Sequence, residues 1–424
     1  MLPLFASTRR LCYNPISLPS RPLTATQNSP AGFSFLVRNN GTQEETFRNA
    51  FDVLQNAITA RAFPACSLAI TLRGELIAHH ALGNFTYDPA SPPVAAPSVF
   101  DLASVTKPVA TTTMAMILYE RGLLDLEAPL TAIVPEFTAD DSRHRDVTLR
   151  MLLAHASGLP AYEKLFLRAK TRDDLLAAAF STDLTADPGT RAEYSDLGFI
   201  ILAVALERLA DESLDTFCQR EIFGPLGMAH TTFNPPKAWR DKIIPTVDER
   251  GIEECGTDTL VRQPPKSPAQ STASKFRGRI IQGEVQDENA SVLGGIAGHA
   301  GLFAPAEDVA IFAHAMLSGG RPFLRPTTIE LFTRRESAPA DTSRALGWDT
   351  PSSPSQSGKY FGPRSYGHLG YTGTSLWIDP DRQLSMTLLT NRTWPDCQNQ
   401  AIKQVRPAFH DAVIEALKSR GLIQ

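Results

Sequence analysis

Apolar positions follow two different spacings along this chain, and the change between them outlines its architecture. Near the start, Phe47, Phe51, Leu54 and Ile58 recur at helical spacing within residues 44–61. The apolar runs at 66–72 and 75–80 then flank an Arg-Gly pair, which is typical of a tight β-hairpin turn. The first third of the chain is therefore expected to supply a helix and a hairpin.

The middle of the chain is expected to be helical. Residues 109–121 form a long apolar segment closed by Gly122, as a buried helix with a glycine C-cap would be. Shorter helical patterns follow at 147–155, 172–180, 197–210 and 213–222. We therefore interpret residues 109–230 as a helical subdomain.

Proline, serine and glycine then interrupt the pattern. Residues 234–290 are predicted to be a loop-rich insertion, and a glycine-rich stretch at 294–301 leads into a helix near 306–317. A second hairpin is expected from the strand-like runs at 375–378 and 384–389, followed by a terminal helix at 398–419. Strands at both ends around a helical middle predict an α/β protein of the α+β type: an antiparallel sheet flanked by helices, with an inserted helical subdomain.

Composition excludes several classes of function. Charged residues make up 20% of the chain and the net charge is -4, which gives no basic field for nucleic acid. No apolar run is long enough for a membrane span. Zinc-ligand and phosphate-binding motifs are absent from the sequence, so we expect neither a metal nor another cofactor.

The N-terminus and the cysteines are the features of the sequence that bear on the cellular compartment of the protein. Residues 1–43 contain no acidic residue and four arginines; they are expected to be a disordered segment, a leader or a start site assigned too early. We take residues 44–420 as the folded domain. The five cysteines are scattered and odd in number, without the spacing of a disulfide framework. With no clear signal peptide, these features favour the cytoplasm over the periplasm.

Candidate chemistry lies at the start of the buried helix. Ser104 and Lys107 are three residues apart and so share one helix face. A desolvated lysine loses its proton more easily and can activate a serine hydroxyl. A serine followed three residues later by a lysine also arises by chance, so the residues that surround the pair matter.

Two further segments offer such partners. Tyr194 stands in a loop just before a helix, where its hydroxyl can relay a proton or where its ring can simply pack in the core. Residues 367–375 are glycine-rich and enter the second hairpin. Glycines in a strand permit close backbone approach, and N–H groups on such an edge can stabilise an oxyanion.

Taken together, the motifs resemble the serine β-lactamase-like, penicillin-recognising superfamily, and within it the branch of class C β-lactamases, DD-peptidases and related carboxylesterases. The resemblance spans about residues 45–420. Its motifs are Phe100 to Lys107, Leu152 to Pro160, Tyr194-Ser195-Asp196, Ala300 to Phe303 and His368-Leu369-Gly370.

The resemblance implies a β-lactamase/transpeptidase-like fold and an acyl-enzyme mechanism. Ser104 would be the nucleophile, and Lys107 and Tyr194 would share acid and base roles. The backbone N–H groups of Ser104 and Tyr371 would form the oxyanion hole, and Gly370 would adjoin the substrate. The division of roles between Lys107 and Tyr194 stays open.

Two departures from the family pattern carry information. Asp196 replaces the usual Asn, and is expected either to pair with Lys107 or to cap the following helix. His368 replaces a lysine that helps to bind the carboxylate of a β-lactam. This change favours a neutral ester, and a lysine restored at 368 would be expected to favour penicillin hydrolysis. His299 is expected either to line the cleft or to serve as a structural donor.

A carboxylesterase acting on a small ester or amide is therefore the first hypothesis, with β-lactamase or DD-peptidase as alternatives. A DD-peptidase acting on cell-wall peptides would require export. An α/β-hydrolase would need a Gly-x-Ser-x-Gly elbow, which the sequence lacks. A non-catalytic relative that only binds a ligand is a further alternative. The sequence does not indicate an oligomeric state.

Overall fold

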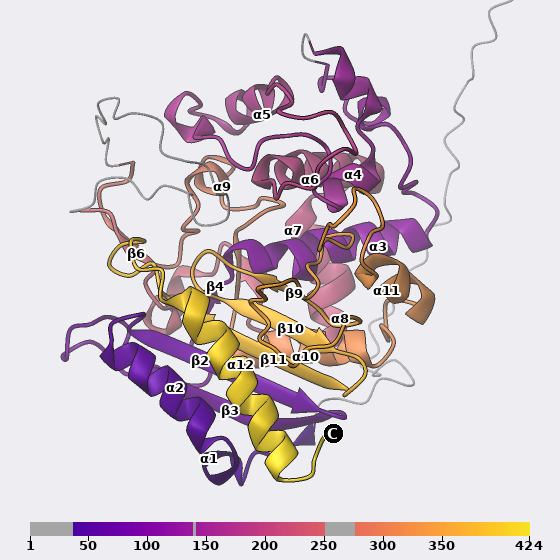
Figure 1. The fold of residues 1–424 in the computed structure, drawn as a ribbon. Coiled ribbons are helices and arrows are strands. Elements are labelled where there is room, and N and C mark those ends of the chain that lie inside the picture. The colour runs from indigo at the N-terminus through magenta and orange to yellow at the C-terminus, as the bar shows by residue number, and fades with distance from the viewer. Residues whose placement is uncertain (1–36, 139–140, 251–275) are drawn as a thin grey trace, which may run out of the picture. The chain divides into compact units, whose positions relative to one another are not determined.

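The protein is built on a mostly antiparallel sheet whose strands come from both ends of the chain. The computed structural model describes residues 37–138, 141–250 and 276–424. Within these ranges the largest sheet has six strands in the order β1-β3-β2-β11-β10-β9, and only β1 and β3 pair in parallel. These strands are Val37–Arg38, Glu75–Gly83, Ala65–Leu72, Leu384–Thr390, Ser375–Asp379 and Tyr366–Leu369 (Figure 1). The predicted fold class is confirmed.

The first hairpin forms where the sequence predicts it. Leu72 of β2 pairs with Glu75 of β3 across the turn residues Arg73 and Gly74. Both turn residues have positive φ, at 51° and 86°, as a tight turn that matches strand twist requires. Central strands β2 and β11 then pair antiparallel, which joins the two ends of the chain in one sheet.

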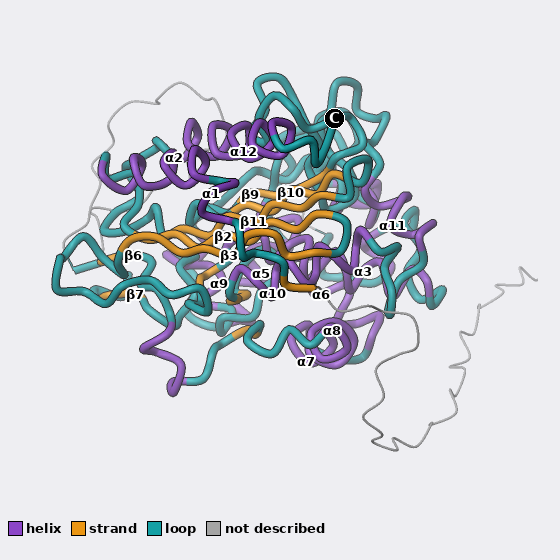
Figure 2. The backbone as a smooth tube through the Cα atoms, turned by 90° about the horizontal axis from the view of Figure 1, so that it is seen from below, coloured by secondary structure: helices purple, strands orange, loops and turns teal. Residues whose placement is uncertain are grey.

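Helices cover both faces of the sheet. On one face lie α2 (Arg48–Thr59) and α12 (Ile402–Ser419), which contact each other, and on the other lies α10 (Ala306–Leu317) (Figure 2). Alternate β2 side chains therefore enter different cores: Leu68 packs with the α2 and α12 residues, whereas Ala69 packs with the larger core beneath. Burial on both faces explains why every residue of β2 is buried.

The predicted helical block follows. Its α-helices are α3 (Thr113–Glu120), α4 (Leu149–Leu153), α5 (Arg172–Phe180), α6 (Asp196–Ala210), α7 (Leu214–Cys218) and α8 (Gly224–Leu226). Short helical turns accompany them at Ala103–Val105 (η1), Lys107–Thr112 (η2), Leu130–Ala132, Ser142–Asp146, Leu165–Leu167 and Gln219–Phe223. In the described part of residues 102–231 the chain forms no strand.

The remaining elements surround this block. The short strands are β4 (Phe100–Asp101), β5 (Thr232–Phe233), β6 (Val247–Asp248), β7 (Ile280–Ile281) and β8 (Leu302–Ala304). The remaining helices are α1 (Gln43–Thr46), the short turn Lys237–Lys242, α9 (Glu288–Val292) and α11 (Pro326–Thr333). Strand β8 pairs with both β4 and β5, so the segment just before Ser104 is tied to the chain near 302.

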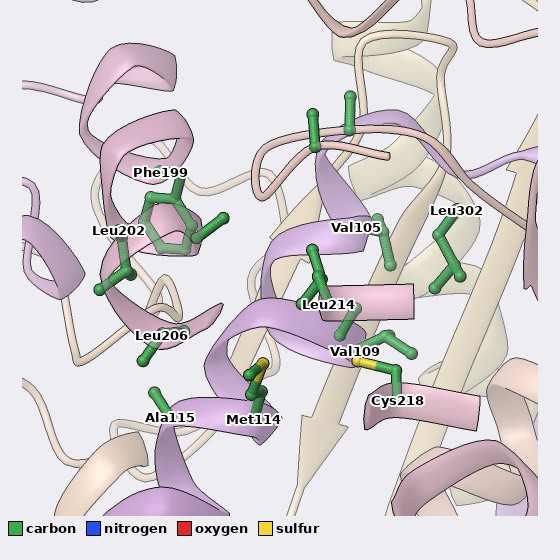
Figure 3. Packing of buried hydrophobic residues seen from close by; sticks show 14 of the residues in the cluster. Val105, Val109, Met114, Ala115, Phe199, Leu202, Leu206, Leu214, Cys218 and Leu302 are labelled. Atoms are coloured by element: carbon green, nitrogen blue, oxygen red, sulfur yellow. The ribbon is translucent and has the colours of Figure 1, made fainter. Parts of the chain in front are cut away.

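The helix that follows Ser104 is the centre of the larger core. Every residue from Val105 to Leu118 is buried. Val105, Val109 and Met114 face side chains of α6, α7 and β8, among them Phe199, Leu202, Leu214 and Leu302 (Figure 3). Residues Lys107–Thr112 form a π-helical turn before α3 begins, a geometry that often occurs at functional sites. Gly122 follows the helix with a φ of 70°, as predicted.

Three expectations need adjustment. The ordered chain begins before residue 44, because Val37 and Arg38 pair with β3; residues 1–36 lie outside the described residues. In the 234–290 insertion, β6 pairs with β7 and α9 begins, while residues 251–275 lie outside the described ranges. Cys66 and Cys218 are buried free thiols, but Cys397 is disulfide-bonded. The interpretation of the cysteine spacing was therefore wrong for Cys397, because the spacing of cysteines in the sequence does not show which residues lie close together in space.

No helix of the described residues is long and apolar enough to cross a membrane.

Candidate active site

The side chains of Ser104, Lys107 and Tyr194 meet in one cluster. The Lys107 Nζ lies 3.0 Å from Ser104 Oγ and 2.6 Å from the Tyr194 hydroxyl. The Tyr194 hydroxyl in turn donates to Ser104 Oγ at 2.6 Å. A serine hydroxyl is thus in direct contact with an amine and a phenol, as an activated nucleophile requires.

Lys107 is fully buried, and its other partners are acceptors. Its Nζ lies 2.6 Å from Asp196 Oδ1, and it donates to the backbone carbonyl of His299 at 3.1 Å. Of the two sequence alternatives for Asp196, the structure has the ion pair. The helix cap belongs instead to Ser195, whose Oγ accepts from the backbone N–H of Gly198.

The electrostatics of the cluster favour a neutral amine over a phenolate. Burial lowers the pKa of Lys107 below its ordinary value, although Asp196 opposes the shift. Burial raises the pKa of Tyr194 well above its ordinary value, and Asp196 adds to that shift. Proton loss is therefore eased at Lys107 and made harder at Tyr194.

The backbone just before Ser104 adopts a conformation that few side chains favour. Ala103 has a φ of 47°, in the left-handed region. The Asp101 carboxylate accepts from the N–H of Ala103 at 2.8 Å and from the N–H of Gln286 at 2.7 Å. Burial raises the pKa of Asp101 to about 6. Asp101 thus fixes the bend that presents Ser104 to the cavity.

The loop from β9 to β10 is fastened to the same bend. Thr372 Oγ1 donates to the carbonyl of Asp101 at 2.8 Å, and Thr374 Oγ1 donates to the carbonyl of Leu102 at 2.9 Å. A Cβ added at Gly370 would lie 1.9 Å from Thr374 Oγ1 and 2.6 Å from the Leu102 carbonyl. Glycine at 370 is therefore needed for this close approach.

Arg406 of α12 orients the peptide bond that follows Gly370. Its guanidinium is buried and donates to the carbonyl of Gly370 at 2.8 Å and to those of Gly373 and Thr374. In a trans peptide the C=O and the next N–H point in opposite directions. Arg406 thereby holds the N–H of Tyr371 directed away from itself.

His155 supports the loop that carries Tyr194. Its Nδ1 accepts from the N–H of Ser195 at 3.0 Å, and its carbonyl accepts from the N–H of Glu193. Its ring lies 4.7 Å from the Tyr194 ring and 5.0 Å from the Phe199 ring, between centroids. Burial keeps the pKa of His155 well below its ordinary value, so a neutral imidazole fills this position.

His368 does not line the cavity, although the family resemblance placed it beside the substrate. It is buried, its Nδ1 faces the carbonyl of Leu369 at 2.8 Å, and it is not among the residues that line the cavity. Burial, with the charges of Lys107 and Arg344, holds the pKa of His368 well below its ordinary value. A direct contact of His368 with substrate is therefore not supported, because the ring packs behind the site, 6.1 Å from the Tyr194 ring.

His299 has contacts that bear on both of its expected roles, at the cavity and with a carboxylate. It lines the cavity, and its Nε2 pairs with Asp287 Oδ1 at 2.8 Å. Burial alone would raise the pKa of Asp287, but His299 brings it below its ordinary value. The neighbouring Glu288 has its pKa raised to about 7 by burial and by Asp287.

The cluster opens into a cavity of about 750 Å³. The lining includes Ser104, Tyr194, Asp196, His299, Gly370 and Tyr371, and adds residues that the sequence analysis did not select: Asp101, Tyr162, Asp287, Glu288, Arg392, Lys403 and Arg406. The described residues contain no group of three His, Cys, Asp or Glu able to hold a metal ion. The added residues come from segments far apart in sequence, and among them only Asp101 lies inside a motif of the sequence analysis.

Comparison with known proteins identifies the family. The β-lactamase family model matches residues 50–406. This chain belongs to the β-lactamase family. It is a serine hydrolase, as are the family and the chain's relatives.

Two curated relatives cover most of the chain. The "N-acetylmuramyl-L-alanine amidase" of Bacillus subtilis (strain 168) is 31% identical over 359 residues, 78% of each chain. The "Putative D-alanyl-D-alanine carboxypeptidase" of Salmonella agona (strain SL483) is 30% identical over 368 residues, 80% of this chain and 81% of that one.

Solved structures support the fold. "EstCE1, a hydrolase with promiscuous acyltransferase activity" has a TM-score of 0.68 and 22% identity, covering 88% of this chain and 100% of that one. A penicillin-binding protein homologue from Caulobacter crescentus has a TM-score of 0.66 and 18% identity, covering 88% and 98%.

Proposed function

We propose that this serine hydrolase cleaves small carboxylic esters through an acyl-enzyme on Ser104. The observation that carries the proposal is the contact of Ser104 Oγ with both Lys107 and Tyr194 at the edge of the cavity. A buried amine with a lowered pKa is suited to receive the proton of a serine hydroxyl.

In the first step, Ser104 Oγ attacks the ester carbonyl carbon and its proton passes to the neutral Lys107 amine, directly or through the Tyr194 hydroxyl. The backbone N–H groups of Ser104 and Tyr371 stabilise the oxyanion. The C–O bond to the alcohol breaks, and the alcohol leaves with the proton held by Lys107. Water then attacks the acyl-enzyme by the same proton route, which releases the acid and restores Ser104.

The raised pKa of Tyr194 and its contacts with Ser104 and Lys107 support a relay role for its hydroxyl. A phenol that keeps its proton can donate to Ser104 Oγ while it accepts from Lys107, as the two 2.6 Å contacts allow. We therefore assign the base to Lys107. We expect Lys107→Ala to lose hydrolysis and Tyr194→Phe to retain hydrolysis, because the proton of Ser104 can also pass directly to Lys107.

A second candidate is cleavage of an amide bond in a cell-wall peptide. The names of the two curated relatives favour it, since one is an amidase and the other a putative D-alanyl-D-alanine carboxypeptidase. The acyl-enzyme chemistry would be the same, with an amine as the leaving group. Kinetics on p-nitrophenyl esters, nitrocefin and D-Ala-D-Ala peptides would rank these reactions by kcat/KM.

Labelling with a fluorophosphonate probe tests the proposal, because such probes react with activated serines. We expect labelling of the wild-type chain and none of Ser104→Ala. Nearby Ser195→Ala, which removes a helix cap and no proposed reacting group, is the matched serine control and should still be labelled. An unlabelled wild-type chain would instead indicate a non-catalytic relative.

A further inference from the structure

A cation outside the cavity lining lies over the ring of Tyr194. The guanidinium carbon of Arg344 is 5.4 Å from the centroid of that ring, and Lys107 Nζ is 4.7 Å from the same centroid. Arg344 belongs to the segment between α11 and β9 and is not among the residues that line the cavity. An aromatic face attracts a cation within about 6 Å, so one phenol ring brings the two basic side chains close together.

A short turn joined to β9 carries Arg344. Arg344 and Asp349 form an isolated antiparallel bridge, and the N–H of Ala345 donates to the carbonyl of Trp348 at 2.9 Å. Asp349 in turn exchanges backbone hydrogen bonds with Gly367 of β9, at 2.8 and 2.9 Å. The turn is therefore a continuation of the main sheet, and it gives Arg344 a rigid support.

The same turn packs against the helical segment that carries Lys107. The N–H of Gly347 donates to the carbonyl of Leu153 in α4 at 2.8 Å. Gly347 has a φ of 78°, and a Cβ added there would lie 1.9 Å from Thr112 Oγ1. Thr112 ends the helical turn η2, which begins at Lys107. The positions of Arg344 and Lys107 are thus fixed relative to each other by direct packing of their backbones.

Asp349 neutralises Arg344 only in part. Its Oδ1 lies 3.8 Å from Arg344 Nη1, and the two side chains are 19% and 21% exposed. The same Oδ1 accepts from Ser343 Oγ at 2.7 Å and from the N–H of Thr350 at 3.0 Å. A charge-assisted hydrogen bond between a guanidinium and a carboxylate is about 2.7–2.9 Å long. The wider spacing and the shared acceptor leave Arg344 with positive charge that acts on its other neighbours.

Charged groups on three elements act on Lys107. Burial is the largest influence and lowers the pKa of Lys107. The carboxylates of Asp196, at the start of α6, and Asp287, just before α9, oppose that shift, whereas the positive charge of Arg344 adds to it. Arg344 therefore acts against the two carboxylates that favour the protonated amine.

The other groups around the pair contribute no net charge. Burial and Asp196 raise the pKa of Tyr194, so the phenol keeps its proton. His155 and His368 lie near the Tyr194 ring, and burial holds the pKa of each well below its ordinary value. The backbone carbonyl of His299 accepts from Lys107 and is uncharged. Arg344 is thus the cation that faces Lys107 across the ring.

We propose that Arg344 is a positioning residue for the reaction: its positive charge, held over the Tyr194 ring, disfavours a proton on Lys107 and keeps that amine able to accept the serine proton near neutral pH. The inference rests on the proposed acyl-enzyme function and adds a residue that acts through Lys107 from outside the cavity lining. A guanidinium suits this role because it stays charged at every pH at which the enzyme can work.

Removal of the charge tests the proposal. In Arg344→Gln the protonated form of Lys107 is no longer disfavoured by a neighbouring cation, so the neutral amine appears only at higher pH. We expect the acidic limb of kcat/KM for p-nitrophenyl acetate to move to higher pH by about 0.5 unit or more. The rate of fluorophosphonate labelling against pH should move with it. Arg344→Lys keeps the charge and should leave the limb close to its wild-type position.

Controls separate this effect from a structural one. Arg220→Gln, at an exposed arginine paired with Glu212, should leave the limb in place. Asp196→Asn is expected to move the limb to lower pH, so the double variant Arg344→Gln/Asp196→Asn should have a limb between those of the two single variants. If Arg344→Gln does not fold, Asp349→Asn replaces it. Loss of that counter-charge strengthens the action of Arg344 and should move the limb to lower pH.

The outcomes distinguish the two proposals. A limb that stays in place or moves to lower pH in Arg344→Gln overturns the role of Arg344, and so does an Arg344→Lys limb displaced as far as that of Arg344→Gln. Where Arg344→Gln does not fold, an unmoved limb in Asp349→Asn has the same meaning. In each case an active, labelled wild-type chain leaves the acyl-enzyme proposal standing. No hydrolysis and no labelling of the wild-type chain at any pH overturns the proposed function itself.

Discussion

The Nζ of Lys107 lies 2.6 Å from Asp196 Oδ1, and the lysine side chain is fully buried while the carboxylate is 14% exposed. The same Nζ contacts Ser104 and Tyr194. The amine proposed to take up the serine proton is therefore held by a carboxylate that favours its charged form. This opposition between burial and Asp196 should set the pH at which the enzyme becomes active.

Asp196→Asn should shift the acidic limb of the pH profile to lower pH. Asparagine keeps the shape but removes the charge that raises the pKa of Lys107. The pKa of Lys107 then falls further, so the neutral amine is present at lower pH and kcat/KM rises earlier. The measurement is kcat/KM for p-nitrophenyl acetate against pH, with the exposed Asp173→Asn as control. An unmoved limb, or one moved to higher pH, would contradict the role of Lys107 as base.

His155→Phe should weaken both the fold and the activity. Phenylalanine keeps a ring against Tyr194 and Phe199 but leaves the N–H of Ser195 without its acceptor. An unsatisfied buried donor costs about 1–3 kcal/mol. We expect urea denaturation to show that loss and kcat to fall, with partial rescue by His155→Asn, which restores an acceptor. Wild-type stability and kcat in His155→Phe would show that the contact to Ser195 is dispensable.

Gly370→Ala should disturb the site directly. The added methyl would lie 1.9 Å from Thr374 Oγ1, and relief of that overlap requires the strand end to move from the bend at Leu102. Overpacking of this kind costs about 1–3 kcal/mol, and a displacement of about 1 Å at a reacting site can cost about 100-fold in rate. Gly362→Ala is the control, because its nearest contact is at 3.9 Å. Equal esterase rates for the two variants would refute this account of Gly370.

His368→Lys is expected to lower stability without favouring nitrocefin hydrolysis, whereas the sequence alone suggests that it would favour penicillin hydrolysis. The side chain is buried near the charges of Lys107 and Arg344 and does not line the cavity. A third cation there would be uncompensated, at a cost of about 3 kcal/mol. Thermal unfolding should show lower stability than for His368→Gln, and the ratio of nitrocefin to ester hydrolysis should not rise. A stable variant with a higher ratio would restore the sequence-based interpretation.

Local patterns predicted most of the fold. The helical patterns at 306–317, 172–180 and 147–155 gave α10, α5 and α4, because these signals lie within a few residues. The two hairpins followed from turn residues in the same way. Strand β1 was missed because two residues carry no periodicity, and the π-helical turn at Lys107–Thr112 depends on tertiary packing.

The site residues that belong to a sequence motif were predictable. Ser104, Lys107 and Tyr194 were selected from the sequence, and the structure brings their side chains together. The choice between two roles for Asp196 was not possible from the sequence, since a carboxylate just before a helix suits a helix cap as well as an ion pair. In the structure Ser195 provides the cap. Arg406 gave no signal because its role depends on the carbonyls of Gly370, Gly373 and Thr374, which lie within reach of its guanidinium only in the folded chain.

The most direct test of the account is to trap the covalent intermediate. The chain is mixed with p-nitrophenyl acetate, quenched in acid within the first turnover, and analysed by intact and peptide mass spectrometry. We expect one acetyl group per chain on Ser104, no adduct in Ser104→Ala, and slower formation in Lys107→Ala. Turnover without an adduct on Ser104, or an adduct that persists in Ser104→Ala, would contradict the central claim.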